Sequence, residues 1–121
     1  VLHLAVKGGA ATSSEISGQM GVPRSVIATL AKPLQKAGIL TTQRGTGGGF
    51  ALGRRPEDIS LYAIINAMEG TTRINRCLEP DGYCSRNGVE TCPVHKFYSR
   101  IQSYLDEAFQ DKTIASLMED A

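Results

Sequence analysis

The sequence predicts a mainly α-helical fold with one small β-hairpin. In most of the 121-residue chain, apolar residues recur at three- and four-residue spacing, the period of an amphipathic helix. One segment, residues 39–53, instead places two short β-prone runs around a glycine-rich turn. With 41% apolar and 21% charged residues, the chain has the size and composition of one ordinary globular domain.

The first 40 residues predict three helices. The apolar run "VLHLAV" opens the chain, and a helix-turn-helix pattern follows it. Thr12–Ser14 supply N-capping oxygens, and Gly21 suits the left-handed residue that ends a short helix. Pro23 is tolerated in the first turn of the next helix. In a helix-turn-helix protein, this next helix enters the major groove of DNA.

That second helix of the pattern has one apolar face and one small, polar or basic face. We expect the apolar face to be packed, with Val26, Ile27, Leu30 and Leu34. The first turns of such a helix touch base edges, whereas two merely packed helices would leave the same face solvated. The candidate DNA-binding residues on the outer side are Arg24, Ser25, Ala28, Thr29 and Lys32.

The predicted hairpin has strands at Ile39–Gln43 and Phe50–Gly53, joined by a turn at Gly45–Gly49. Placed after a helix-turn-helix, this hairpin is a wing. Arg44 stands at its tip, where a guanidinium can enter a narrow minor groove, and Gln43 beside it is a further candidate. A phosphate-binding loop is disfavoured because "GTGGG" leads into a strand and lacks a following Lys-Ser/Thr.

Charge divides the chain into two unlike parts. Residues 1–56 carry seven basic side chains and one acidic one, whereas residues 57–121 carry six basic and eleven acidic ones. The net charge of +1 therefore hides a basic half and an acidic half. We expect a DNA-binding winged helix-turn-helix in residues 1–56. Residues 57–121 would form a linker helix, a cysteine loop at residues 77–95 and a dimerisation helix.

The acidic part predicts three helices. The first has Ile59, Tyr62, Ile65 and Met68 on one face and ends at Gly70. The last is a short helix capped by Thr113. Between them a long helix has an apolar stripe, which a second copy of the helix would cover in a homodimer or the chain's own domain would cover in a monomer. The stripe consists of Val94, Phe97, Tyr98, Ile101, Leu105, Ala108 and Phe109.

The loop "CLEPDGYCSRNGVETCPVH" holds every cysteine of the chain. Cys77, Cys84 and Cys92 are followed by His95, so four soft or borderline ligands lie within one segment. Such ligands select zinc, copper(I) or iron–sulfur clusters. The uneven gaps lack the close C-x2-C pairs of zinc ribbons. Spacing alone leaves three alternatives: an iron–sulfur cluster, zinc, or bare thiols that act as a redox switch.

These features together resemble the Rrf-type bacterial winged-helix regulators, which include an iron–sulfur cluster regulator and a nitric-oxide-sensing repressor. The resemblance covers nearly the whole chain. It rests on "KAGIL", "QRGTGGGFALGR", "ISLYAIINAMEG", the three cysteines and the long helix. It implies that Arg44 enters the minor groove and that Arg24, Ser25, Ala28 and Thr29 read bases. Ala28 stands where the iron–sulfur cluster regulator has a glutamate, so that regulator's operator preference does not carry over.

The resemblance also implies a cofactor. Cys77, Cys84 and Cys92 match the family's three cysteines in order, and His95 matches the fourth ligand of a two-iron two-sulfur cluster. A four-iron four-sulfur cluster with a ligand from elsewhere is the alternative.

The function expected from the sequence is that of a homodimeric regulator that binds double-stranded DNA operators and senses redox state, nitric oxide or iron–sulfur status. One alternative is a cluster-free family member regulated by a small molecule, a partner protein or cysteine oxidation. Another is a cluster-bearing electron carrier. The sequence offers no nucleophile–base pair that would indicate an enzyme. Because three cysteines cannot all pair and no apolar run reaches about 18 residues, we expect a cytoplasmic protein without a membrane partner.

Overall fold

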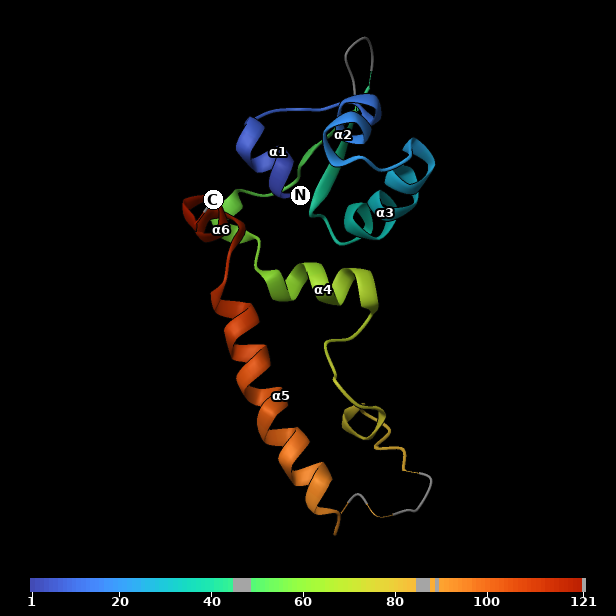
Figure 1. Ribbon diagram of the computed structural model, residues 1–121, viewed down its shortest axis with the longest axis vertical. Coiled ribbons are helices and arrows are strands. Elements are labelled where there is room, and N and C mark those ends of the chain that lie inside the picture. The colour runs from blue at the N-terminus through green and yellow to red at the C-terminus, as the bar shows by residue number, and fades with distance from the viewer. Residues whose placement is uncertain (45–48, 85–87, 89, 121) are drawn as a thin grey trace.

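The computed structural model describes residues 1–44, 49–84, 88 and 90–120. It confirms a mainly helical fold with one antiparallel hairpin, and Figure 1 shows a long helix that extends away from the hairpin and the first three helices. None of the described helices is long and apolar enough to cross a membrane. In chain order the elements are α1 Leu2–Lys7, α2 Ser13–Met20, α3 Arg24–Lys36, β1 Leu40–Gln43, β2 Gly49–Leu52, the 3-10 helix η1 Pro56–Asp58, α4 Leu61–Glu69, the 3-10 helix η2 Arg76–Leu78, α5 Pro93–Asp111 and α6 Ile114–Asp120.

The predicted helix ends are confirmed at their caps. The Thr12 hydroxyl accepts a hydrogen bond from the backbone N–H of Glu15 at the start of α2. Gly21 ends α2 and Gly70 ends α4, with left-handed φ angles of 65° and 75°. Pro23 is the N-cap of α3 and therefore lies one residue before the predicted first turn. Proline fits there because its fixed φ is compatible with this extended position and it has no N–H to leave unsatisfied.

The wing pairs β1 with β2, so that Leu40 faces Leu52 and Gln43 faces Gly49. The predicted turn residues 45–48 lie outside the described part of the chain. On the free edge of β2, Ala11 and Phe50 exchange two backbone hydrogen bonds of 2.9 and 2.8 Å. A Cβ on Gly49 would lie 2.1 Å from the Ala11 carbonyl oxygen, so this close approach of two backbones requires glycine.

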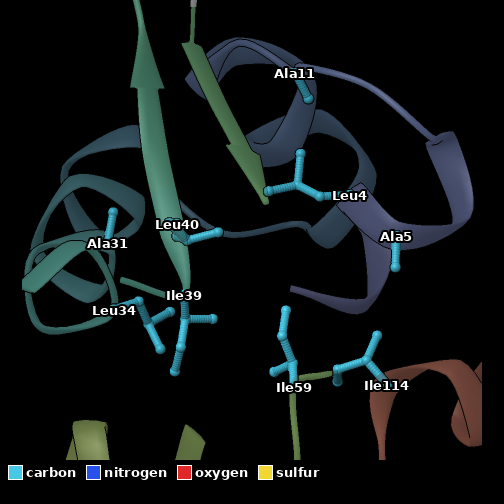
Figure 2. Packing of buried hydrophobic residues seen from close by; sticks show 9 residues of the cluster. All are labelled: Leu4, Ala5, Ala11, Ala31, Leu34, Ile39, Leu40, Ile59 and Ile114. Carbon is cyan, nitrogen blue, oxygen red and sulfur yellow. The ribbon is translucent and has the colours of Figure 1, made fainter. Parts of the chain in front are cut away.

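The core joins the winged helix to the ends of the acidic part (Figure 2). Ile39 and Ile59 are completely buried, and Ile114 at the start of α6 is nearly so. Because Ile59 and Ile114 come from the acidic part, that part is anchored directly in the winged-helix core. The buried apolar cluster consists of Leu4, Ala5, Ala11, Ala31, Leu34, Ile39, Leu40, Ile59 and Ile114.

The predicted apolar face of α3 is only partly right. Leu34 is buried, but Val26 and Leu30 are 41% and 43% exposed, and Ala31 is buried in their place. The face that packs against the core is therefore rotated from the apolar stripe. Leu30 instead lines an apolar hollow of about 350 Å³ between α1, α2 and α3.

The predicted face of α4 is also only partly right. Ile59 lies before the helix in extended conformation, because Ser60 caps α4 by accepting the N–H of Ala63. Helical spacing counted from Ile59 is therefore out of phase with the helix. The residues of α4 that pack against the core are Ala63, Ile64, Ala67 and Met68, of which the prediction included only Met68.

Two backbone hydrogen bonds fix the junction between α5 and α6 to residues 59–61, at the start of α4. The N–H of Leu61 donates to the Lys112 carbonyl over 2.7 Å, and the N–H of Ile114 donates to the Ile59 carbonyl over 2.9 Å. The predicted cap of α6 is confirmed, since Thr113 Oγ1 accepts from the N–H of Ser116. From this attachment, α5 runs away from the winged helix to its N-terminal end (Figure 1).

Candidate functional site

The outer face of α3 is accessible, as a DNA-reading face must be. Thr29 is held in the helix by a 3.0 Å hydrogen bond from its hydroxyl to the Ser25 carbonyl. Within the described part of the chain, no ion pair engages Arg24 or Lys32, so both charges face solvent. The exposed candidates on this face are Arg24, Ser25, Ala28, Thr29 and Lys32.

The wing is linked to that helix. Gln43 ends β1, Arg44 follows it, and both are exposed. The side-chain amide of Gln35 on α3 donates to the hydroxyl of Thr42 on β1. This hydrogen bond connects the two candidate DNA-binding elements, so α3 and the wing present their polar side chains as parts of one unit.

The cysteine site lies at the far end of α5 from the winged helix. Cys77 belongs to η2, Cys92 is the N-cap of α5, and His95 lies in the first turn of that helix. The imidazole Nδ1 of His95 is 3.2 Å from the Cys77 sulfur. Both residues line a hollow of about 300 Å³, together with Asn75, Arg76, Tyr83, Cys84, Cys92, Val94 and Tyr98.

Cys77, Cys84 and Cys92 are each half-buried. The structure thus brings Cys77 and His95 into contact and places Cys84 and Cys92 on the same hollow. Residues 85–87 and 89, which belong to the predicted loop, lie outside the described residues. Within the part that is described, no three His, Cys, Asp or Glu side chains converge closely enough to hold a single metal ion.

A salt bridge shapes the turn between Cys77 and Cys84. Both guanidinium nitrogens of Arg76 bind the Asp81 carboxylate, and this hydrogen bonding lowers the pKa of Asp81 and raises the pKa of Arg76. The same guanidinium lies 5.3 Å from the centre of the Tyr83 ring, within cation–π range. These contacts fold residues 76–83 back on themselves, next to the two thiols.

Sequence patterns did not predict the polar contacts between α5 and the linker that precedes Cys77. Gln102 is the one buried polar side chain in the described structure, with 4% exposure. It and Asp106 bind the linker residues Thr72–Ile74. The sequence does carry a signal for Gln102, which is a polar residue at helical spacing among the apolar or aromatic residues Tyr98, Leu105 and Phe109.

The predicted apolar stripe of α5 divides into two faces. Tyr98, Leu105 and Phe109 share the face of Gln102 and are half-buried. Val94, Phe97 and Tyr104 are 54%, 55% and 63% exposed. With Ile101 and Ala108 these exposed residues recur at alternating steps of three and four, the spacing of a coiled-coil seam. We call the residues Val94, Phe97, Ile101, Tyr104 and Ala108 the outer seam.

Comparison with known proteins shows which family the chain belongs to. A family model described as "Rrf2: Iron-dependent Transcriptional regulator" matches residues 1–120. The chain belongs to the Rrf2 family. Among curated relatives, the HTH-type transcriptional regulator IscR of Vibrio atlanticus is 29% identical over 107 residues, which cover 88% of this chain and 60% of the relative. IscR of Aliivibrio salmonicida is 33% identical over 77% of this chain and 56% of the relative.

The chain thus spans 60% or less of the length of these two IscR relatives. Solved structures share its fold. CymR, titled the global cysteine regulator of B. subtilis, superposes with a TM-score of 0.79 at 24% identity, over 99% of this chain and 88% of that one. T. potens IscR superposes with a TM-score of 0.76 at 22% identity, over 98% and 77%. Membership of the Rrf2 family agrees with the resemblance seen in the sequence.

Proposed function

We propose that this Rrf2-family regulator acts as a homodimer on two-fold DNA operators and that an iron–sulfur cluster bound by Cys77, Cys84, Cys92 and His95 controls its operator affinity. The observation that carries the proposal is the 3.2 Å contact of Cys77 with His95 in a hollow that the other two cysteines also line. Cys77 and His95 are 18 positions apart, so their contact results from the fold of the segment between them.

The winged helix would bind DNA with two elements. The exposed first turns of α3 suit the major groove, with Arg24, Ser25, Ala28 and Thr29 near base edges and Lys32 near phosphate. Gln43 and Arg44 at the end of β1 suit the minor groove. The basic charge of residues 1–56 supports this assignment because phosphate neutralisation dominates DNA affinity.

The outer seam supports the dimer. Large exposed apolar side chains in a coiled-coil pattern are stabilised when a second helix removes them from water. Two-fold operators also need two reading heads at a fixed spacing. In this arrangement α5 would connect the partner subunit, the cysteine site and the winged helix.

The donor set fits an iron–sulfur cluster. Three thiols and one imidazole are the soft and borderline ligands that iron–sulfur centres use, and the hollow of about 300 Å³ is comparable to small-ligand sites. Four protein ligands can hold either a two-iron or a four-iron cluster, and the imidazole among them favours the two-iron one, since histidine ligates the two-iron Rieske centres. When bound, such a cluster supplies a centre whose redox state and integrity respond to oxygen, nitric oxide or iron supply.

The chain's own residues would connect this site to the DNA. Cys92 and His95 lie at the start of α5, whose other end is hydrogen-bonded to Ile59 and Leu61 beside the winged-helix core. Ligation would fix Cys77 and Cys84 against the start of α5. This would fix the angle between α5 and the winged helix of each subunit. The distance between the two DNA-binding surfaces, and hence the spacing of the half-sites they bind, would follow from that angle.

A cluster-free regulator that responds to thiol oxidation or a small molecule is the second candidate. The fold is shared with CymR as well as IscR, and all three cysteines are partly accessible to solvent. A zinc site remains a third reading of the same ligands. Both alternatives predict a colourless protein.

The deciding experiment is anaerobic purification with iron, sulfide and zinc counts and a visible spectrum. We expect iron and sulfide in equal amounts, and a chromophore that Cys77→Ala, Cys84→Ala and Cys92→Ala each remove or destabilise. His95→Ala should shift the spectrum, whereas the other histidine, His3, offers a matched control in His3→Ala. A parent protein without iron and sulfide would favour the cluster-free regulator.

A further inference from the structure

We propose that Gln102 and Asp106 are positioning residues for the cysteine site: they fix the register of the linker along α5 and so bring Cys77 to His95. The linker here is residues 71–75, which connect α4 to η2. The inference deepens the proposed function, since it assigns two further residues to the same site. It concerns contacts of the protein alone and is testable without any bound cluster.

Gln102 binds two consecutive parts of the linker backbone. Its side-chain carbonyl accepts the N–H of Ile74 over 2.7 Å, and its amide donates to the Thr72 carbonyl over 2.8 Å. The amide also donates to Asp106 over 2.8 Å, which fixes its orientation. A buried glutamine that pairs with a backbone donor and a backbone acceptor specifies one register, because a one-residue shift would leave buried polar groups unpaired.

Asp106 adds two contacts on the same segment. Its carboxylate accepts the Thr72 hydroxyl over 2.9 Å and the guanidinium of Arg73 over 2.8 Å. Asp106 is only 21% exposed, and Arg73 is 37% exposed. Together the two α5 residues hold three consecutive linker residues, Thr72, Arg73 and Ile74, by backbone and side chain.

The register of these contacts predicts where Cys77 must lie. Cys77 lies five positions after Thr72, and because Arg76–Leu78 form the 3-10 helix η2 this stretch spans less than the about 16 Å of extended chain. His95 lies eleven positions before Asp106, about 16 Å along the helix. The contacts Thr72–Asp106, Ile74–Gln102 and Cys77–His95 follow in this order, so the linker runs antiparallel to α5 and reaches His95 at Cys77.

A slip of one residue would move the linker by about 3.3 Å, which exceeds the tolerance of a ligand contact. Nothing else in η2 and its flanking turn binds α5 by a side-chain hydrogen bond apart from the Cys77–His95 contact, within the residues described. Gln102 and Asp106 are thus the polar contacts that determine the position of Cys77 along α5 before any cluster is bound.

The test uses the full chain under reducing conditions, free of iron, and measures the proximity of the His95 ring to the Cys77 β-protons by nuclear magnetic resonance. Gln102→Ala should weaken this contact severalfold. Gln110→Ala, the same substitution at an exposed position of α5, should leave it unchanged. A folded Gln102→Ala protein that keeps the full contact would overturn the inference.

If Gln102→Ala fails to fold, Thr72→Val tests the same point more gently, because it removes only the hydroxyl bound by Asp106. A shifted contact supports the inference and an unchanged one opposes it.

In iron-loaded protein, Gln102→Ala should lower iron affinity by about 10- to 100-fold, as the loss of ligand-supporting contacts does. A parent that binds no iron would sink the proposed function but leave the resonance test of the register intact. Unaltered iron affinity in Gln102→Ala would sink the inference alone.

Discussion

The imidazole of His95 lies 3.2 Å from the sulfur of Cys77, although the two residues are 18 positions apart. One comes from the start of the long helix α5 and the other from the 3-10 helix η2. The contact joins the two ends of the cysteine segment across the hollow. It therefore shows that the fold itself, without any ligand, brings together donors that the sequence only places in the same loop.

The wing arginine is expected to bind the minor groove. Arg44→Ala should weaken operator binding by about 1–3 kcal/mol, the size of one good groove contact, and leave the dimer intact. Arg55→Ala is the matched control because Arg55 is already paired with Glu57 and Asp58. Fluorescence anisotropy at two salt concentrations measures both variants. If Arg44→Ala binds the operator as tightly as the parent does, Arg44 does not contact DNA and the assignment of the wing to the DNA interface is wrong.

Lys32 is expected to contact phosphate, which carries no base information. Lys32→Ala should therefore weaken binding to operator and random DNA alike, and reduce the slope of log affinity against log salt by about 1. Titrations over a range of salt concentrations measure that slope. A loss confined to the operator would instead assign Lys32 to base recognition.

The outer seam is expected to form the dimer interface. Tyr104 is 63% exposed, so Tyr104→Glu should leave the subunit folded but place an unpaired charge in the interface, at a cost of several kcal/mol. Monomers should result. Ser103→Glu, one position along and exposed, is the control. Sedimentation velocity distinguishes the two states, and an intact Tyr104→Glu dimer would place the interface elsewhere.

Sequence patterns predicted well what local chemistry determines. Thr12, Gly21 and Gly70 act as caps because an hydroxyl acceptor or a left-handed residue is needed at fixed places in any helix. The hairpin was predicted to within one residue at each strand end. The cysteines and His95 were identified as a group from their composition and spacing, before their contact was known.

The sequence did not predict which helix faces are buried or which residues contact the linker, because both depend on residues that are distant in the sequence. On α3, Ala31 is buried and Leu30 is 43% exposed, because burial follows the placement of the core rather than the size of the side chain. On α5, one apolar stripe proved to be two faces with different roles, and the buried Gln102 between them binds a linker whose path no local pattern specifies. The DNA-binding and ligand roles of the candidate residues remain predictions.

The close approach of Gly49 in β2 to Ala11 provides a test of the fold. Gly49→Ala should lower the free energy of unfolding by about 1–3 kcal/mol, because the new methyl group would meet the Ala11 backbone at 2.1 Å. Gly9→Ala is the control, since nothing lies within 4 Å of a Cβ there. Urea denaturation measures both. Equal stability would mean that Ala11 and β2 are less closely apposed than they are in the structure.

The central claim, that the cysteine site controls DNA binding, is tested most directly by one comparison. Operator affinity is measured anaerobically for the parent protein with its cluster and after the cluster has been removed, at the same salt concentration. A homodimer whose cysteine site is coupled to its reading heads should show a difference of about 5- to 150-fold between the two states. Equal affinity in both states would contradict the claim, even if every proposed ligand proved correct.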